Sequence, residues 1–283
     1  MEPAALVDRL RRLQDGTLTP VPARDSATVL LLRDGPAGPE AYLLRRRSAL
    51  VFAGGRHVFP GGAVEPGDVE PVLAGDRPGG WAGPAPGEWA ARLRCDEVLA
   101  RGLVRAAVRE TFEEAGVLLA GPPGGPVLDD VAGDAWEDER ARLDAGEQTL
   151  PELLARRGLV LRSDLLRPLA HWITPEAEPK RFDTRFFLAA LPPGQQCRAA
   201  GSEADERVWV RPAEARARGL SLMPPTAAAL AAVVDAPDVA AALAAERTLA
   251  PVLPRLALRE GRVVGDGPGW AGGTQGAGPG SAL

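Results

Sequence analysis

Short apolar runs of strand length alternate with amphipathic, helix-length segments along most of the chain. The run SATVLLLR at 26–33 and the run AYLLR at 41–45 are each long enough for a buried strand, and the Gly- and Pro-rich residues 34–40 between them predict a hairpin turn. Further strands are expected at 55–60, 117–119, 169–173, 184–191 and 207–210. Strands interspersed with helices favour an α/β fold in which helices pack on a sheet.

Helices are expected in the segments between these strands. Leucines recur at helical spacing within residues 1–14. Asp96 is a suitable N-cap and Gly116 a suitable C-terminal residue for a long helix, although Gly102 weakens its middle and favours one short helix followed by a second. Other helices are expected at 134–145, 150–157, 212–218, 225–236 and 238–247.

The segment RAAVRETFEEAGV at 105–117 carries the sharpest chemical pattern. On a helix, positions three and four apart share a face, so Glu110, Glu113 and Glu114 form one carboxylate cluster. Hard divalent cations relieve the repulsion within such a cluster, because Mg²⁺ and Mn²⁺ take oxygen ligands and usually sit beside substrate phosphates. A lone ExxEE is more often a solvated acidic face, so the surrounding sequence decides.

A second block, HVFPGG at 57–62, provides that surrounding sequence. Two glycines after a proline suit a tight strand exit where the backbone approaches another group closely. Together the two blocks resemble the Nudix box, G-x5-E-x7-R-E-U-x-E-E-x-G-U. The positions that carry the resemblance are Gly62, Asp68, Arg109, Glu110, Glu113, Glu114 and Gly116.

The first half of the box departs from the family pattern twice. Asp68 stands where the family has Glu, and forty residues separate it from Arg109 where the pattern has seven, which predicts an insertion of 33 residues. Such an interrupted box resembles the coenzyme A diphosphatase branch of the family, typified by a mammalian peroxisomal enzyme. The further blocks that resemble this branch are FAGGRHVFPGG at 52–62, WITPEAEPKRFDTRFFL at 172–188, GSEADERVW at 201–209 and MPPT at 223–226.

The resemblance implies a Nudix-type α/β/α sandwich around a mixed β-sheet, with an insertion before the catalytic helix and extra C-terminal helices. The expected division of the chain is an N-terminal helix and linker at 1–24, a Nudix hydrolase domain at 25–222 with the insertion at 69–101, C-terminal helices packed on the core at 223–258, and a flexible Gly/Pro-rich tail at 259–283.

The family's site residues carry over to matching positions of this chain. The resemblance implies that Glu110, Glu113 and Glu114 bind Mg²⁺ or Mn²⁺, that Gly62 shapes the turn over the metal, and that Arg109 braces the loop and the carboxylates. Asp68 either binds metal or braces the helix, and its shorter side chain counts against the first role.

Many Nudix enzymes use an acidic residue outside the box as general base. Glu203, ahead of Glu206, is the choice here, with a solvated acidic loop as the alternative. Substrate contacts are expected from the residues Arg45, Arg47, Arg56, Arg181, Gly61 and Gly62. A solvated strand end is the plainer interpretation of the arginines at 45–47. Trp81 and Trp89 either line a substrate groove or anchor the inserted loop.

The composition of this 283-residue chain limits the kinds of partner that it can bind. The formal net charge of −5 argues against a nucleic-acid coat, while local basic residues and bound metal can still attract an anionic small molecule. The two cysteines imply no disulfide framework, and no apolar run of membrane-spanning length occurs, so a cytoplasmic protein is expected. The terminal Ser281-Ala282-Leu283 resembles a peroxisomal address only weakly. A homodimer is left open.

These observations lead to one preferred function and two alternatives. The preferred function is metal-dependent hydrolysis of a diphosphate linkage, with coenzyme A or acyl-CoA split into 3′,5′-ADP and a phosphopantetheine product. The first alternative keeps the chemistry and replaces the substrate by an ADP-ribose-like or other nucleoside diphosphate-linked compound. The second is a non-catalytic Nudix-fold module that binds a nucleotide.

Overall fold

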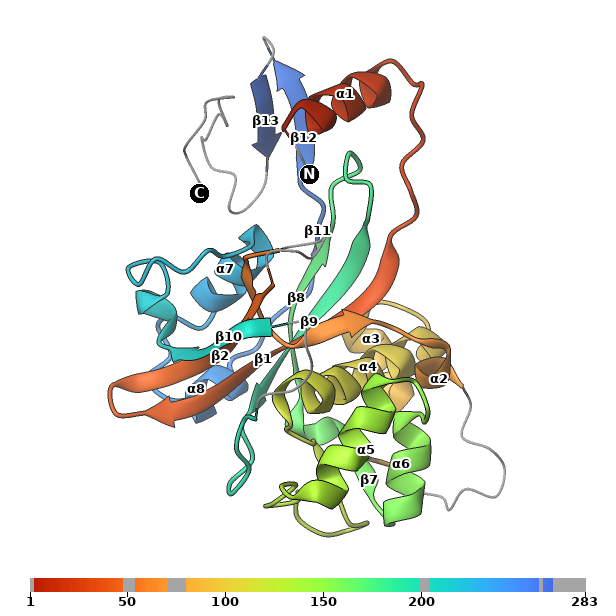
Figure 1. Ribbon diagram of the computed structural model, residues 1–283, viewed down its shortest axis with the longest axis vertical. Helices are drawn as coiled ribbons and strands as arrows, with labels where there is room; N and C mark the ends of the chain where they lie inside the picture. The colour runs from red at the N-terminus through yellow and green to blue at the C-terminus, as the bar shows by residue number, and fades with distance from the viewer. Residues whose placement is uncertain (1–2, 48–53, 71–79, 199–203, 260–261, 267–283) are drawn as a thin grey trace.

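A mixed sheet forms the centre of the computed structural model, which describes residues 3–47, 54–70, 80–198, 204–259 and 262–266 (Figure 1). Within these residues the sheet has eight strands in the order β10-β2-β1-β9-β8-β11, with β3 added to β2 and β4 added to β1. The β1–β9 and β8–β11 pairs are parallel and the others antiparallel. The strands are β1 (Arg24–Gly35), β2 (Gly38–Arg46), β3 (His57–Val58), β4 (Gly61–Ala63), β8 (Arg167–Ile173), β9 (Phe182–Ala190), β10 (Ala204–Val210) and β11 (Pro251–Val252).

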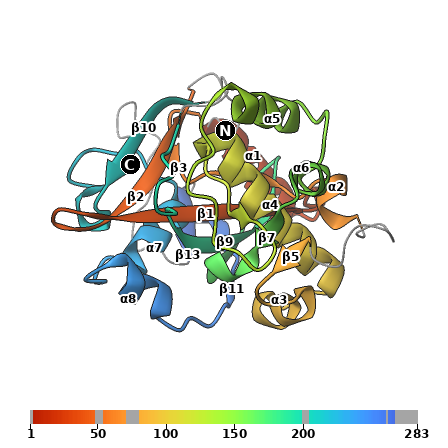
Figure 2. The ribbon, with the colours of Figure 1, turned by 90° about the horizontal axis from the view of Figure 1, so that it is seen from below.

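Helices cover both faces of this sheet, and two small sheets lie beside it (Figure 2). The helices are α1 (Pro3–Gln14), α2 (Pro66–Val69), α3 (Pro86–Leu93), α4 (Glu97–Ala115), α5 (Asp134–Asp144), α6 (Leu150–Arg157), α7 (Pro224–Ala231) and α8 (Val239–Ala244). One small sheet joins β5 (Trp81–Ala82), β7 (Val160–Arg162) and β6 (Ala120–Gly121); the other is the hairpin of β12 (Arg255–Arg259) and β13 (Arg262–Asp266).

The middle of strand β1, residues 29–32, is buried on both faces of the sheet, which explains its unbroken apolar sequence. Val29 and Leu31 face a core shared with α3, α4, α5 and α6. Leu30 and Leu32 face a second core shared with α7 and α8. The arrangement confirms the predicted α/β/α sandwich around a mixed sheet.

The long helix α4 is uninterrupted, so the expected weakness at Gly102 is wrong. Gly102 is buried where α2 packs on α4, and a Cβ added there would lie 2.6 Å from Val69 Cγ1. The glycine therefore allows a close approach of the two helices rather than a break. The inserted segment does contain a short helix, α3, but it lies at Pro86–Leu93, before the predicted start near Asp96, and it ends at Arg94, which has a φ of 55°.

Several other elements differ from the sequence prediction. The helix expected at 212–218 is only a 3₁₀ turn at Pro212–Glu214. The strand expected at 117–119 is absent: these residues are buried, and the strand β6 begins after them, at Ala120. The expected strand at 55–60 is replaced by the short strands β3 and β4 on either side of the Pro60 turn. Strands β11 to β13 were not expected, and β13 lies inside the segment predicted to be a tail.

The rest of that segment, residues 260–261 and 267–283, lies outside the described residues. In the part of the chain that the structure describes, every helix is too short or too polar to cross a bilayer.

The close packing at Gly102 predicts the effect of a larger side chain there. Gly102→Val should lower the free energy of unfolding by about 1–3 kcal/mol, because the added methyls overlap with Val69 and Val64 of the α2 region. Val98→Ala, at a position of α4 that is 52% exposed, is the control and should change stability by less than about 0.5 kcal/mol. Urea denaturation measures both variants. A Gly102→Val protein as stable as the wild type would contradict this packing.

Candidate functional site

Helix α4 presents its carboxylates near its C-terminal end. The helix begins at Asp96, whose side chain accepts a hydrogen bond from Leu99 N (2.8 Å), and ends at Gly116 with a φ of 66°. No basic residue lies in its last turn. The C-terminal end of a helix carries partial negative charge, so Glu113 and Glu114 add to a region that is already negative. A nearby cation would stabilise this end.

The buried Arg109 guanidinium supplies part of that positive charge. Its Nη1 donates to Glu110 Oε1 and to Glu113 Oε2, both at 2.9 Å. Its Nη2 donates to Asp68 Oδ2 (3.0 Å) and to Ala63 O (2.9 Å). One side chain of α4 thus fixes two carboxylates of its own helix and ties them to the segment that follows β4.

Asp68 reaches Arg109 because α2 folds back on α4. The Asp68 side chain, 2% exposed, accepts from Glu65 N (2.9 Å) and so helps to begin α2. Arg105 of α4 holds the same turn, since its Nη1 donates to Asp68 O (3.0 Å) and to Glu70 O (2.7 Å). Of the two roles considered for Asp68, the structure therefore supports bracing.

The glycine turn meets the acidic helix directly. Gly61 N donates to Glu114 Oε2 (2.9 Å), and a Cβ added to Gly62 would lie 2.1 Å from Glu110 Oε1. A Cβ at Gly61 would lie 1.9 Å from Thr28 Oγ1 on the paired strand β1. Both glycines are needed because neither neighbour leaves room for a side chain. The two halves of the motif are therefore adjacent, despite the forty residues between Asp68 and Arg109.

A cleft of about 1410 Å³ opens over this junction. Glu110, Glu113 and Glu114 line it together with Gly61 and Gly62. Basic residues on other segments line it as well, and these are Arg24, Arg46, Arg56 and Lys180. An apolar part is formed by Trp172, Phe182, Phe186, Met223, Pro224 and Pro225. The cleft combines carboxylates, cations and aromatic surface in one space.

Burial disfavours the ionised forms of the glutamates in the cleft. Burial raises the pKa of Glu110 to about 7, against the opposing effect of Arg109, and burial raises the pKa of Glu113 to about 8. Burial lowers the pKa of Arg109, but its contacts with Glu110, Asp68 and Glu113 outweigh this and raise it. Arg109 alone does not offset the burial of its two glutamates.

The donor set fits a hard divalent cation. Three carboxylates line one cleft, and hard cations such as Mg²⁺ prefer oxygen ligands. Within the described residues no three acidic, histidine or cysteine side chains converge on a single point. One oxygen of Glu110 and one of Glu113 are bound to Arg109. The carboxylates would have to move closer together to share one cation.

The residues expected to contact substrate divide into two groups. Arg56, Gly61 and Gly62 line the cleft. Arg45 does not, because its guanidinium binds Asp205 Oδ1 and Oδ2 (2.9 and 3.1 Å) and Glu206 Oε2 (3.3 Å) on the neighbouring strand β10. Arg47 is exposed and lies outside the cleft lining.

Arg181 also lies outside the lining, and it donates to the backbone oxygens of Thr174 (3.0 Å) and Val21 (2.8 Å). Of the three arginines considered at 45–47, only Arg46 lines the cleft, and the alternation of side chains along β2 places it on the face opposite to Arg45. The expected general base Glu203 lies outside the described residues, and Glu206 pairs with Arg45.

The tryptophans of the inserted segment anchor it rather than line the cleft. Trp89 is fully buried and contacts Phe187 edge-on at 5.7 Å between ring centroids. Trp81 Nε1 donates to Pro84 O (2.7 Å) within its own turn. Neither residue lines the cleft.

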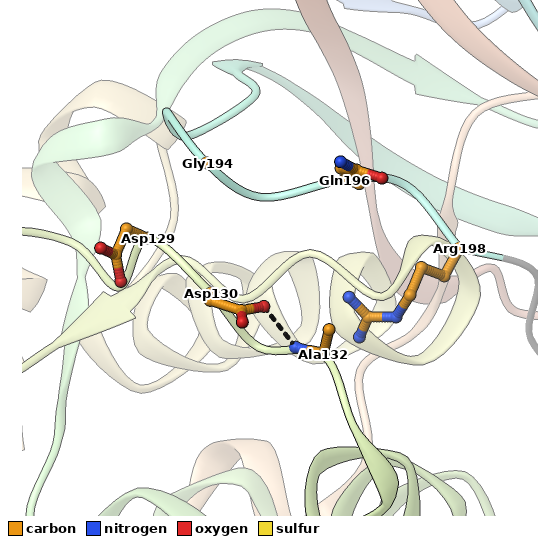
Figure 3. Close-up of a pocket in the computed structure, with 6 residues that line it drawn as sticks. All are labelled: Asp129, Asp130, Ala132, Gly194, Gln196 and Arg198. Carbon is orange, nitrogen blue, oxygen red and sulfur yellow. Dashed lines mark hydrogen bonds between the residues drawn. The ribbon is translucent and has the colours of Figure 1, made fainter.

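Figure 3 shows a second, smaller cleft of about 460 Å³. It lies beside the C-terminal end of α4, where Arg198 N donates to Ala115 O (2.8 Å). Its lining residues are Asp129, Asp130, Ala132, Gly194, Gln196 and Arg198. Asp130 accepts a hydrogen bond from Ala132 N (2.8 Å), and Arg198 donates to Glu137 Oε1 (2.8 Å) and Val131 O (2.7 Å). None of the predicted site residues contributes to it.

Known proteins resemble this chain in sequence and in fold. No family model matches it. The crystal structure of a NUDIX hydrolase from Alicyclobacillus acidocaldarius superposes with a TM-score of 0.63 at 30% sequence identity, covering 80% of this chain and 97% of that one. The acyl-coenzyme A diphosphatase NUDT19 of Gallus gallus is 29% identical over 211 residues, which cover 59% of this chain and 55% of that protein. The chain thus spans about half the length of this curated relative.

A third protein has a lower structural similarity to this chain. The NUDIX domain of Shewanella oneidensis NrtR, solved in complex with ADP ribose, superposes with a TM-score of 0.39 at 11% identity, covering 82% of this chain and 96% of that one. A likeness of this size has no bearing on the ligand of the present chain.

The tight contact at Gly62 predicts a specific loss of cation binding. Gly62→Ala should weaken Mn²⁺ binding about 10- to 100-fold, because the added carbon displaces the Glu110 carboxylate. Gly87→Ala is the matched control, since a Cβ there meets Glu97 Oε2 at an ordinary 3.6 Å. Electron paramagnetic resonance of free Mn²⁺ measures both proteins. Equal affinities for the two variants would contradict the placement of Glu110 beside Gly62.

Proposed function

The chain belongs to the Nudix hydrolase family, and we propose on that basis that it hydrolyses a diphosphate linkage between two organic groups with Mg²⁺ or Mn²⁺. The proposed substrate is coenzyme A or an acyl-CoA, and the products are 3′,5′-ADP and phosphopantetheine or its acyl ester. The observation that carries the proposal is the junction of the Gly61–Gly62 turn with Glu110 and Glu114 at the floor of a large cleft.

In this proposal Glu110, Glu113 and Glu114 hold the cations. A bound divalent cation neutralises charge on the phosphoryl oxygens and lowers the pKa of water beside it. Arg109 holds Glu110 and Glu113 in fixed orientations by binding Oε1 of the first and Oε2 of the second. Gly61 N keeps Glu114 in the same place by donating to its Oε2. Carboxylates that are held in this way need less reorganisation when a cation binds than freely rotating ones.

The rest of the cleft supports a nucleotide-like substrate. Its volume of about 1410 Å³ is above the roughly 300–1,000 Å³ usual for small-molecule sites, so a ligand with two organic groups fits in it. Arg24, Arg46 and Arg56 provide guanidinium groups suited to phosphate. Phe182 and Phe186 provide aromatic surface for a base or an acyl group. The similarity to an acyl-coenzyme A diphosphatase favours coenzyme A among such substrates.

The proton acceptor remains a separate proposal. Glu203 belongs to the segment between β9 and β10, and β10 pairs with β2, whose Arg46 lines the cleft. A carboxylate in this connection would take the proton of the attacking water.

An ADP-ribose-like substrate is the alternative that keeps the same site. The carboxylates, arginines and aromatic residues of the cleft suit any nucleoside diphosphate with a second organic group. A module that binds without turnover is disfavoured by the complete set of Glu110, Glu113 and Glu114 in one cleft.

Product analysis separates these substrates. Purified protein is expected to convert coenzyme A with Mn²⁺ into 3′,5′-ADP and phosphopantetheine, detected by mass spectrometry. Chelation of the metal with EDTA should abolish turnover, and added Mn²⁺ should restore it, because the carboxylates need a cation to act on phosphate. Consumption of ADP-ribose with intact coenzyme A would favour the alternative substrate. Turnover that survives EDTA would contradict the metal-dependent reaction.

Substitution of the acidic cluster tests the assigned ligands. Glu113→Gln and Glu114→Gln should each lower kcat/KM by about a thousandfold or more, because an amide oxygen stabilises a divalent cation far less than a carboxylate. Glu97→Gln, at an exposed position of the same helix, is the matched control and should retain wild-type kinetics. Circular dichroism checks that all three variants fold. Wild-type turnover in either site variant would remove that residue from the ligand set.

A further inference from the structure

One wall of the cleft is formed by the loop that joins β8 to β9. Thr174, Pro175, Glu178, Pro179 and Lys180 of this loop line the cleft. The loop reaches toward α1 and β12, which lie together at one end of the molecule (Figure 1). Segments from both ends of the described chain thus meet behind a wall of the candidate site.

Helix α1 binds the back of this loop. Arg9 Nε donates to Ala177 O at 2.6 Å, between residues that are 168 positions apart. Ala177 is 1% exposed and packs in a small core with Leu10 of α1 and Val263 of β13. Leu256 and Leu258 of β12 pack against the same core. The middle of the loop is therefore held by a hydrogen bond and by apolar burial at once.

The two ends of the loop are fixed as well. Arg181 Nε donates to Thr174 O (3.0 Å), and its Nη1 donates to Val21 O (2.8 Å) in the connection from α1 to β1. Phe182 N donates to Thr174 Oγ1 (3.0 Å), which closes the base of the loop. Arg181, expected to contact substrate, instead joins the loop to the segment behind it.

Arg9 also affects a charged group that faces the cleft. Burial raises the pKa of Glu178, and Arg9 is among the positive charges that oppose this rise. The Arg9 Nη2 atom is itself buried, and it has no hydrogen-bond acceptor within the described part of the chain. Among the described residues, the hydrogen bond from Nε to Ala177 O keeps the guanidinium beside the loop, and Nη2 is left without an acceptor.

From these contacts we infer that Arg9 is a positioning residue for the substrate cleft, which holds the β8–β9 loop in place for the part of the substrate remote from the carboxylates. The inference rests on the proposed hydrolysis. Arg9 is absent from the cleft lining, whereas the loop residues on either side of its partner Ala177 belong to it. Loosening the loop should therefore weaken substrate binding and leave the reacting centre on α4 unchanged.

The test compares Arg9→Ala with Arg9→Lys and with Arg11→Ala, an exposed arginine of the same helix. Arg9→Ala should raise KM about three- to tenfold for whichever of coenzyme A and ADP-ribose the wild type cleaves, with kcat within about twofold. Arg9→Lys keeps a donor and should recover part of the loss, and Arg11→Ala should match the wild type. Hydrogen–deuterium exchange should become faster at 174–181 in Arg9→Ala and stay unchanged in α4.

Each result has a defined meaning. Unchanged KM and unchanged exchange at 174–181 in Arg9→Ala would overturn the inference. A fall in kcat at constant KM, or faster exchange throughout the chain, would show that α1 acts on the whole fold and would also overturn it. If the wild type cleaves neither compound, the proposed function fails. Hydrogen–deuterium exchange at 174–181 and titration of the protein with ADP still test whether Arg9 holds the loop. In that case weaker ADP binding by Arg9→Ala than by Arg11→Ala supports the inference, and equal binding overturns it.

Discussion

The buried guanidinium of Arg109 is the interaction on which the candidate site depends. It binds carboxylates from two separate segments, Asp68 of α2 and the Glu110–Glu113 pair of α4, and it also binds the backbone at Ala63. Buried charges are costly unless they are paired and hydrogen-bonded. Arg109 meets this condition for Asp68 and meets it only in part for Glu110 and Glu113, whose pKa values are raised to about 7 and 8.

The incomplete neutralisation explains how one cluster can be both structural and reactive. Asp68 is enclosed by Arg109 and the α2 backbone, so it braces the site. Glu110 and Glu113 share the same arginine but also line the cleft, and their raised pKa values mean that their ionised forms lack sufficient positive charge nearby. A residue set that was fully paired would hold the fold and leave nothing to attract a divalent cation. A divalent cation would supply the missing positive charge, and this need is the physical basis of the proposed reaction.

Close backbone approach brings these parts together across the inserted segment. Gly102 lets α2 lie against α4, and Arg105 ties the end of α2 by donating to Asp68 O and Glu70 O. Gly61 and Gly62 let the turn after β3 touch Thr28 and Glu110. The long interruption in the motif is tolerated because its two ends are fixed by these contacts, while Trp89 anchors the inserted helix α3 in the core.

Local signals in the sequence were enough to predict the central elements. The ends of α4 follow from Asp96 and Gly116, and the burial of β1 on both faces follows from its apolar run. The proximity of the glycine turn to the acidic helix followed from the motif resemblance, and the structure places the two in contact. The metal ligands and the domain limits remain predictions.

Contacts between segments that are far apart in the chain could not be predicted from the sequence. Gly102 reads as a helix breaker unless the helix packed against it is known. Arg45 and Arg46 differ only in the face of β2 that each occupies, and only the second faces the cleft. The joining of α1 with β12 and β13 depends on contacts between the two ends of the chain, which no local pattern encodes.

The central claim is that the cleft-facing oxygens beside Arg109 hold divalent cations. A crystal of the protein grown with Mn²⁺ tests this most directly through anomalous scattering at the manganese edge. The account predicts a peak in the cleft with oxygens of Glu110, Glu113 and Glu114 at about 2 Å. Manganese bound only elsewhere, or a cleft without a peak at saturating Mn²⁺, would contradict it.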